Sequence, residues 1–272
     1  MILKARSKQY NLNNRTHIMG ILNVTPDSFS DGGKYTEVEQ AVAQAIKMQE
    51  DGADIIDIGG ESTRPNHEPV PESEEIARVV PMIQAVKERV SIPISIDTYK
   101  AETARRAVEA GAEIINDVWG AKRDPEIAAV AAEYNVPLVL MHNRTNMNYT
   151  SIIDDMKRDL IESIEIALQA GVAAENIIID PGIGFAKTAA HNLTVMNHLE
   201  KFHDLGYPVL LATSRKRFIG SILGTEPEER DNGTAATTCL GIAKGVQMVR
   251  VHNVKMNVEA AKVMDAMLRE RM

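Results

Sequence analysis

Short runs of β-branched and aliphatic residues recur along the chain, and segments with helical spacing separate them. The eight runs span residues 16–23, 54–60, 92–97, 113–118, 136–142, 176–182, 207–214 and 247–252. Most are nearly continuous in apolar residues, which is typical of strands that are covered on both faces. In the segment 151–170, Met156, Leu160 and Ile164 recur on one helical face, and Gly171 follows as a stop signal. Alternating strands and helices predict a parallel sheet.

Eight strand–helix units in 272 residues predict an α/β fold of one domain, a (β/α)8 TIM barrel that spans 1–272. A doubly wound open sheet is the alternative. Residues 1–15 precede the first unit and contain few apolar positions, so we expect a short strand or hairpin that covers one barrel end. The longest connections, 24–36, 59–71 and 141–150, follow the first, second and fifth strands. In this fold such loops form the mouth where ligands bind, so these three are candidate site loops.

The amino-acid composition agrees with this fold and excludes several classes of protein. Hydrophobic residues make up 44% of the chain and charged residues 25%, which excludes a disordered chain or a disulfide scaffold. Aromatic residues are only 4%, so aliphatic side chains and methionines must fill the core, as is usual where helices pack on a sheet. The net charge is −8 and no block of like charges is present, which argues against a nucleic-acid partner.

Cysteine usage and hydropathy bear on the compartment. The lone Cys239 excludes an intrachain disulfide and a thiolate metal cage. No apolar run reaches the length of a membrane span, and the first residues lack the apolar core of a secretion signal. We therefore expect a cytoplasmic protein with no membrane partner.

Nearly every strand run ends in a polar or charged residue. These residues are Asn23, Asp57, Asp97, Asn116 with Asp117, His142, Asp180, Ser214, and Arg250 with His252. Each alone is equally well explained as a cap or turn residue. In a barrel, however, the carboxyl ends of all strands meet at one mouth, so the set predicts a single crevice lined by these side chains.

Charge is distributed unevenly among these strand ends. Acids and amides follow the third, fourth and sixth strands, whereas cations follow the seventh and eighth, in 213–217 and 250–252. We therefore expect a mouth with an acidic and a basic side. The basic side, helped by a helix N-terminus, suits a phosphate group. The acidic side suits the N–H edge of a polar heterocycle, provided that donors or a cation offset the burial of its carboxylates.

Other catalytic signatures are missing from the sequence. It contains no GxxxxGK[ST] phosphate loop, no HExxH helix, no CxxC pair and no GxSxG elbow. Gly182 and Gly184 resemble half of a dinucleotide fingerprint without its third glycine, which argues against NAD. Asn23 and nearby loop oxygens, together with substrate phosphates, suit a hard cation such as Mg²⁺, which needs few protein ligands.

Several long segments resemble the dihydropteroate synthase family of pterin-binding enzymes. They are MGILNVTPDSFSDGG (19–33), DIGGESTRP (57–65), SIDT (95–98), INDVWG (115–120), IIDPGIGF (178–185), SRKRFIG (214–220) and RVH (250–252). The first two are highly specific, because each is long and lies on a different loop. The resemblance spans almost the whole chain.

The resemblance implies an activity and its partners. Enzymes of this family are (β/α)8 barrels, usually homodimers, that act in folate biosynthesis. They join a 6-hydroxymethyl-7,8-dihydropterin diphosphate to 4-aminobenzoate, releasing diphosphate, with Mg²⁺ as the cofactor. The reaction is an alkyl transfer, and we expect a dissociative path, because neutralising the leaving diphosphate leaves a cation that the pterin ring delocalises.

Matched residue by residue, the family motifs also imply site residues. The pterin ring would be bound by Asp97, Asn116, Asp180 and Lys216. The diphosphate side would hold Asn23, Arg250 and His252, with Asn23 as the Mg²⁺ ligand. Two loops that close over the reacting centre would contribute Asp31 and Arg64, which count with Asp180 and Lys216 as catalytic. The 4-aminobenzoate and sulfonamide pocket would be walled by Phe29, Thr63 and Pro65.

One position departs from part of the family, and two other functions stay open. Some family members carry a serine near the aminobenzoate carboxylate where this chain has Arg217, so no contact is assigned to that side chain. A corrinoid-linked methyltransferase would use the same ring-binding acids, but it has little reason for Arg64 or for the basic groups at 214–217 and 250–252. An inactive pterin-binding homologue would be expected to have damaged motifs, and those named above are intact.

Overall fold

The computed structural model describes residues 1–24, 34–61 and 69–269. Its main sheet has eight strands, and neighbouring strands run parallel in the order β8-β7-β6-β5-β4-β3-β10-β9. The strands are β3 (His17–Asn23), β4 (Ile55–Gly59), β5 (Ile94–Asp97), β6 (Ile114–Asp117), β7 (Leu138–Met141), β8 (Ile177–Asp180), β9 (Leu210–Leu211) and β10 (Met248–Val251). All eight lie within the predicted runs.

The two ends of this sheet meet, so the sheet is a barrel. A parallel bridge joins Ile179 of β8 to Val209, and the Ile179 N–H donates to the Pro208 carbonyl at 2.9 Å. The closed ring confirms the predicted TIM barrel and excludes the doubly wound open sheet. Strand β9 is shorter than its predicted run, 207–214. Pro208 has no N–H to donate, which limits pairing at the start of that run.

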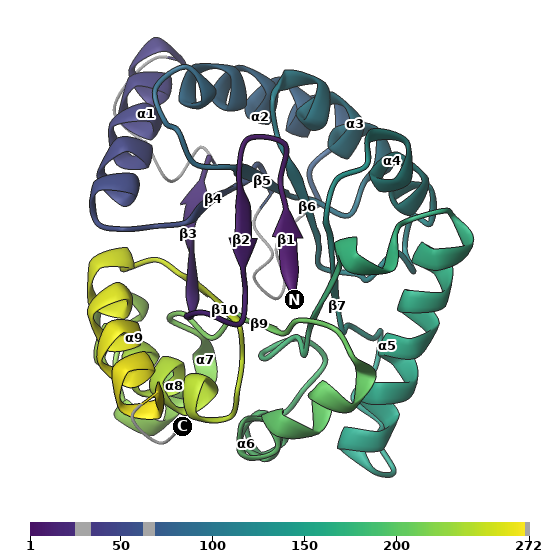
Figure 1. Cartoon of the computed structure of the whole chain (residues 1–272), viewed down its shortest axis with the longest axis vertical. Coiled ribbons are helices and arrows are strands. Elements are labelled where there is room, and N and C mark those ends of the chain that lie inside the picture. The colour runs from purple at the N-terminus through teal and green to yellow at the C-terminus, as the bar shows by residue number, and fades with distance from the viewer. Residues whose placement is uncertain (25–33, 62–68, 270–272) are drawn as a thin grey trace.

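Helices surround the barrel (Figure 1). They are α1 (Lys34–Glu50), α2 (Glu72–Lys87), α3 (Ala101–Ala110), α4 (Glu126–Tyr134), α5 (Ile152–Gln169), α6 (Ala189–Asn197), α7 (Arg217–Leu223), α8 (Asp231–Ala243) and α9 (Val254–Arg269), with short 3-10 turns at Ala174–Asn176, Leu199–Leu205 and Pro227–Glu229. On α5 the predicted stripe of Met156, Leu160 and Ile164 is buried. Gly171, at a φ of +94°, follows the end of this helix.

Alternation along each strand separates two cores. Outward residues such as Ile56 and Ile58 of β4 belong to a large cluster with the helices, whereas Ile55 belongs to a smaller cluster inside the barrel. We call the strand residues of that smaller cluster the inner layer. They are Met19, Ile55, Ile114, Val139, Ile178, Leu210 and Met248. Because side chains alternate with a period of two, the next inward position on each strand lies one level closer to the mouth.

The N-terminal residues form the predicted hairpin. Strands β1 (Ile2–Lys4) and β2 (Gln9–Asn11) pair antiparallel, and Leu3, Tyr10 and Leu12 pack against the inner layer. The Tyr10 hydroxyl donates to the Asp54 carbonyl at 2.5 Å, just before β4 begins. Figure 1 shows the hairpin lying across the barrel end that faces the viewer. The mouth is therefore at the opposite end, where the strands finish.

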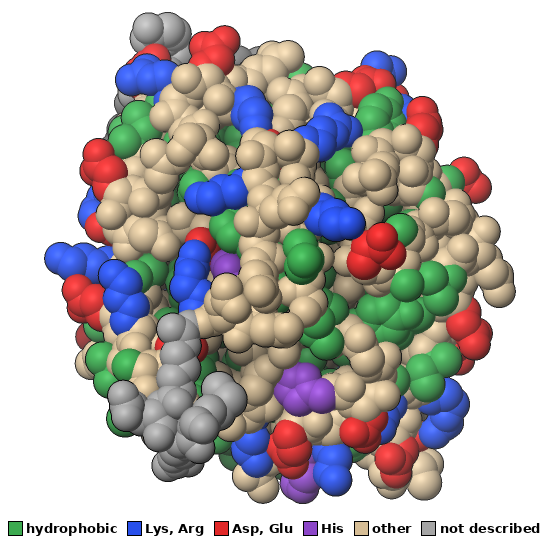
Figure 2. Space-filling model, viewed as in Figure 1, with side chains coloured by type: hydrophobic (Ala, Val, Ile, Leu, Met, Phe, Trp, Pro, Cys, Tyr) green, Lys and Arg blue, Asp and Glu red, His purple; other side chains and the backbone are tan. Residues whose placement is uncertain are grey.

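The hairpin face offers no obvious docking surface of one charge. Figure 2 shows basic and acidic side chains both present on this face, with the hairpin over its centre. Among the helices of the described ranges, none combines the length and the low charge needed to cross a bilayer.

Candidate active site

A polar layer lies directly above the inner layer. Asp57, Asn116, Asp180 and Arg250 each follow an inner-layer residue of the same strand by two positions, and Asp97 ends β5. The three aspartates and Asn116 are at most 5% exposed. The barrel interior thus changes from apolar to polar within one step of the strand repeat. Strands β4, β5, β6, β8 and β10 contribute these five groups, as the strand-end pattern predicted.

Arg250 joins two of the acids. Its Nε donates to Asp57 Oδ2 at 2.5 Å and its Nη2 donates to Asp97 Oδ2 at 2.6 Å. The Asn116 amide also donates to Asp57 Oδ2, at 3.1 Å. Arg250 therefore does not stand on a separate basic side, as the order of charges along the chain had suggested. The acids and the cation interleave, because Arg250 extends inward from β10 past β3 to the inward residues of β4 and β5.

Several polar atoms in this layer and on the strands that carry it have no hydrogen-bond partner. Asp57 Oδ1, Asp97 Oδ1 and the Ser95 hydroxyl are buried and have no hydrogen-bond partner among the described residues. Buried acceptors are costly unless a donor reaches them. Burial raises the pKa of Asp97 to about 7, although Arg250 opposes the shift, and burial also raises the pKa of Asp180. These carboxyls suit a ligand that brings N–H donors.

Lys216 lies beside Asp180 at the start of α7. Burial lowers the pKa of Lys216 to about 8, and the nearby Asp180 carboxylate opposes that shift. The Lys216 ammonium donates to the Ile183 carbonyl and lies 4.7 Å from the centre of the Phe185 ring. Residue Arg215, just before it, has a φ of +57°, a conformation that its ion pair with an acid on α8 helps to hold. This turn aims the lysine into the mouth.

The polar residues that follow β9 and β10 contact each other. The His252 backbone N–H donates to the Ser214 hydroxyl at 3.0 Å, and that hydroxyl also contacts His252 Nδ1 at 2.9 Å. Arg217 is exposed at the first residue of α7. His252 and Ser214 therefore lie together at the mouth, next to the turn that carries Lys216.

Asn23 ends β3 and its side chain is exposed. It pairs in the sheet with Gly59 of β4. No group of three or more histidine, cysteine, aspartate or glutamate side chains suited to a metal is found in the described part of the chain. One amide oxygen fits Mg²⁺ only where phosphate oxygens and water supply the other ligands, as this ion prefers.

Two strand-end residues face away from the mouth. Asp117 accepts hydrogen bonds from the backbone N–H groups of Trp119 and Ala121, at 2.8 and 2.6 Å, so it caps a turn. His142 lies outside the barrel interior and contacts Asp159 of α5. Both follow from alternation, since they share the parity of outward residues on their strands.

Two buried groups were not predicted from the sequence, and five predicted residues lie outside the described part of the chain. The strand-end pattern includes Asp57 but does not mark it as a site residue, although its side chain contacts that of Asn116. Lys187 was not singled out, yet it is only 8% exposed. The predicted residues Phe29, Asp31, Thr63, Arg64 and Pro65 lie outside the described residues.

Comparison with known proteins shows which family this chain resembles in sequence and in fold. A family model described as pterin binding enzyme matches residues 19–252. Dihydropteroate synthase of Bacillus subtilis is 63% identical over 254 residues, covering 93% of this chain and 89% of that protein. Two solved structures of Xanthomonas albilineans dihydropteroate synthase are also similar. One, with 4-aminobenzoic acid, has a TM-score of 0.94 at 43% identity over 98% of both chains. The other, in complex with 7,8-dihydropteroate, has a TM-score of 0.91 at 42% identity, over 98% of this chain and 99% of that one.

Proposed function

This chain belongs to the pterin-binding enzyme family, and we propose that it is a dihydropteroate synthase. It joins 6-hydroxymethyl-7,8-dihydropterin diphosphate to 4-aminobenzoate, giving 7,8-dihydropteroate and diphosphate. The single observation that carries the proposal is the polar layer, in which acids and cations from distant strands converge on one mouth. The ligands of the two Xanthomonas albilineans structures, 4-aminobenzoic acid and 7,8-dihydropteroate, support it.

The acids of the layer would bind the pterin ring. Asp97 and Asp180 accept from the N–H groups of the ring, and Asn116 adds an amide at the same level. Lys216 donates to the carbonyl and ring-nitrogen edge, as its position beside Asp180 allows. The open Oδ1 atom of Asp97 supports this role, because a buried acceptor without a partner is stabilised when a ligand donor reaches it.

The cations would stabilise the leaving diphosphate. Arg250 uses Nε and Nη2 for the two acids, and its Nη1 makes no hydrogen bond to the described residues, so we assign Nη1 to a phosphate. His252, beside Ser214, lies on the same strand end. Neutralising the leaving group favours a dissociative alkyl transfer, and the carboxylates stabilise the cation that remains on the pterin. The aniline nitrogen of 4-aminobenzoate is nucleophilic when neutral, so no strong general base is needed.

We further propose Mg²⁺ as the cofactor, with the Asn23 amide oxygen as its protein ligand. Bound there, the ion would neutralise negative charge on the diphosphate. The exposed position of Asn23 at the end of β3 supports this role, since substrate phosphates and water have access to it. Asp31 and Arg64 are proposed to complete the reacting centre, and Phe29, Thr63 and Pro65 to form the 4-aminobenzoate and sulfonamide pocket.

The protein is also proposed to act as a cytoplasmic homodimer. Apolar side chains stand exposed on three neighbouring helices, among them Ile222 of α7, Leu240 of α8 and Val263 of α9. An exposed apolar surface of this kind favours association with a second copy. Light scattering tests this directly, and Ile222→Glu should shift the mass toward the monomer if the face is the interface.

The alternative functions have less support. A corrinoid-linked methyltransferase releases no diphosphate, so it does not explain His252 at the mouth. An inactive homologue does not explain why the polar layer retains open, buried acceptors. Incubating the protein with the two substrates, with and without Mg²⁺, tests the proposal. Release of diphosphate together with 7,8-dihydropteroate supports it, and a folded protein that releases neither with Mg²⁺ present contradicts it.

A further inference from the structure

The loop 181–186, which follows β8, contacts both acid and cation of the proposed ring site. The Gly182 N–H donates to Asp180 Oδ1 at 2.7 Å. The Ile183 carbonyl accepts from the Lys216 ammonium, and the Phe185 ring lies 4.7 Å from the same nitrogen. The conformation of this one loop therefore sets the position of Asp180 and Lys216 together.

The buried Lys187 side chain binds two backbone carbonyls of this loop. Its ammonium contacts the Gly182 carbonyl at 2.9 Å, the Phe185 carbonyl at 3.0 Å and His142 Nδ1 at 2.9 Å. An ammonium carries three N–H donors, so these three acceptors use all of them. Burial lowers the pKa of Lys187 to about 7, and the nearby Lys216 ammonium adds to that shift. No donor is left for solvent.

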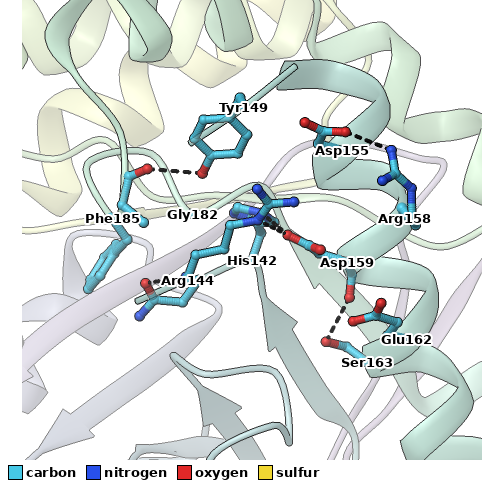
Figure 3. A network of polar contacts seen from close by, with 12 residues as sticks. His142, Arg144, Tyr149, Asp155, Arg158, Asp159, Glu162, Ser163, Gly182 and Phe185 are labelled. Carbon is cyan, nitrogen blue, oxygen red and sulfur yellow. Dashed lines mark hydrogen bonds and ion pairs between the residues drawn. The ribbon is translucent and has the colours of Figure 1, made fainter. Parts of the chain in front are cut away.

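His142 and Asp159 orient Lys187. In its charged form Lys187 only donates, so His142 Nδ1 is then the bare nitrogen and the ring proton is on Nε2. His142 Nε2 is 2.9 Å from Asp159 Oδ2, which accepts a hydrogen bond from the Nε2–H and so favours this tautomer. Burial lowers the pKa of His142 to about 4, so the ring is neutral near pH 7. Figure 3 shows His142 between the loop at Gly182 and Asp159, with Arg144 also reaching Asp159.

The backbone of the loop is fitted closely to this support. Gly182 has a φ of +65°, and a Cβ placed there would lie 2.0 Å from the His142 carbonyl oxygen. The Tyr149 hydroxyl donates to the Ala186 carbonyl at 2.9 Å. The carbonyls of residues 182, 183, 185 and 186 thus all accept from side chains, and Lys187 alone supplies two of those bonds.

We propose that Lys187, oriented by His142 and Asp159, is a positioning residue of the active site. It makes no hydrogen bond to Asp180 or Lys216, and it acts through the loop 181–186 that contacts both. The inference rests on the proposed function, because that function assigns Asp180 and Lys216 to the pterin ring. It adds a role for a buried lysine, a histidine and an aspartate outside the barrel mouth.

The test replaces Lys187 with methionine, which keeps the length of the side chain and removes its donors. Lys157→Met is the matched control, because Lys157 pairs with Asp204 at 2.8 Å on the far side of α5. Turnover is measured with both substrates, and amide hydrogen exchange is measured without them. Lys187→Met should lower kcat by about tenfold to a hundredfold, the cost of misplacing catalytic groups. Amide exchange should accelerate in the loop 181–186, while the strands of the barrel exchange at the parental rate.

The outcomes separate positioning from simple stability. The KM for 4-aminobenzoate should change less than kcat, and Lys157→Met should match the parent in kcat and in loop exchange. A folded Lys187→Met variant with parental kcat, or with faster exchange spread evenly over the barrel, overturns the proposal. His142→Phe removes the Nδ1 acceptor and provides the same test if Lys187→Met does not fold. An inactive parent contradicts the proposed function, whereas the exchange measurement still decides whether Lys187 orders the loop.

Discussion

Arg250 Nη2 lies 2.6 Å from Asp97 Oδ2, although the two residues are 153 positions apart in the sequence. The same guanidinium also contacts Asp57, at 2.5 Å. Asp57 is fully buried and the Arg250 side chain is 14% exposed, so each charge depends on the others for compensation. The Arg250 guanidinium stabilises two buried carboxylates in the polar layer, where the pterin ring is proposed to bind.

Removing this cation should destabilise the fold as well as the reaction. Arg250→Met leaves two buried carboxyls without their partner, and breaking a buried ion pair on one side costs about 3–5 kcal/mol. Guanidinium unfolding at neutral pH measures the loss. Arg106→Met is the control, since Arg106 pairs with Glu102 at 2.7 Å, both side chains are exposed, and such pairs contribute little. Equal unfolding free energies for the two variants would contradict the role given to Arg250.

Turnover should depend strongly on Asp180 and Lys216. Each is proposed to interact with charge that develops in the transition state, and deleting one such contact typically costs about a hundredfold in rate. We expect Asp180→Asn and Lys216→Ala each to reduce product formation by about that factor. The melting temperature of each variant serves as the folding control. Near-parental turnover in either folded variant would remove that residue from the mechanism.

The pH dependence of kcat/KM for the pterin substrate should be bell-shaped. Asp97 must be ionised to accept N–H bonds, so activity should rise through its pKa of about 7. Lys216 must be protonated to donate, so activity should fall above its pKa of about 8. This ratio reports groups of the free enzyme. Lys216→Arg should remove the alkaline limb and leave the acid limb in place, and an alkaline limb unchanged in that variant would assign it to another group.

Asp97 should also give stability a distinctive pH dependence. Its pKa of about 7 in the fold is above the ordinary value of 3.8, so the folded protein binds this proton more tightly than the unfolded chain. The stabilisation is fully present below about pH 4 and is lost as the pH rises through about 7. The unfolding free energy of Asp97→Asn should therefore improve relative to the parent between about pH 4 and pH 7. A constant difference between the two proteins over this range would show that the carboxyl is not perturbed.

The hairpin should matter for stability and not for chemistry. Leu3 is 2% exposed and packs against the inner layer from the barrel end opposite the mouth. Leu3→Ala should lower the unfolding free energy by about 2–5 kcal/mol, as for other buried leucines. The kcat of the folded fraction should stay at the parental value. A parallel loss of kcat in fully folded protein would mean that the hairpin end is coupled to the site.

Much of the fold could be predicted, because each strand carries its own signal. The runs around Ile55, Ile114 and Ile178 are apolar and end in Asp57, Asn116 and Asp180, so both the strand and its polar end are visible locally. Eight such units fit one closed barrel. What the pattern could not decide was which of two adjacent polar residues faces inward. Asn116 and Asp117 are both polar, and only the register of β6 places the first inside.

The contacts between distant residues were beyond local reasoning. Arg250 was grouped with the other cations of its chain segment, but its neighbours in space are Asp57 and Asp97. The sequence around Lys187 does not indicate that it is buried, since lysine is usually exposed. Its acceptors are backbone carbonyls of the loop after β8 and His142, which follows β7. Such pairings depend on the closure of the barrel and on loop conformation.

The most direct measurement is an experimental structure of the protein with bound 7,8-dihydropteroate. The account predicts that the pterin ring lies in the polar layer, within hydrogen-bond distance of Asp97, Asn116, Asp180 and Lys216. A ring bound at the hairpin end, or at the mouth without contact to Asp180 and Lys216, would contradict it.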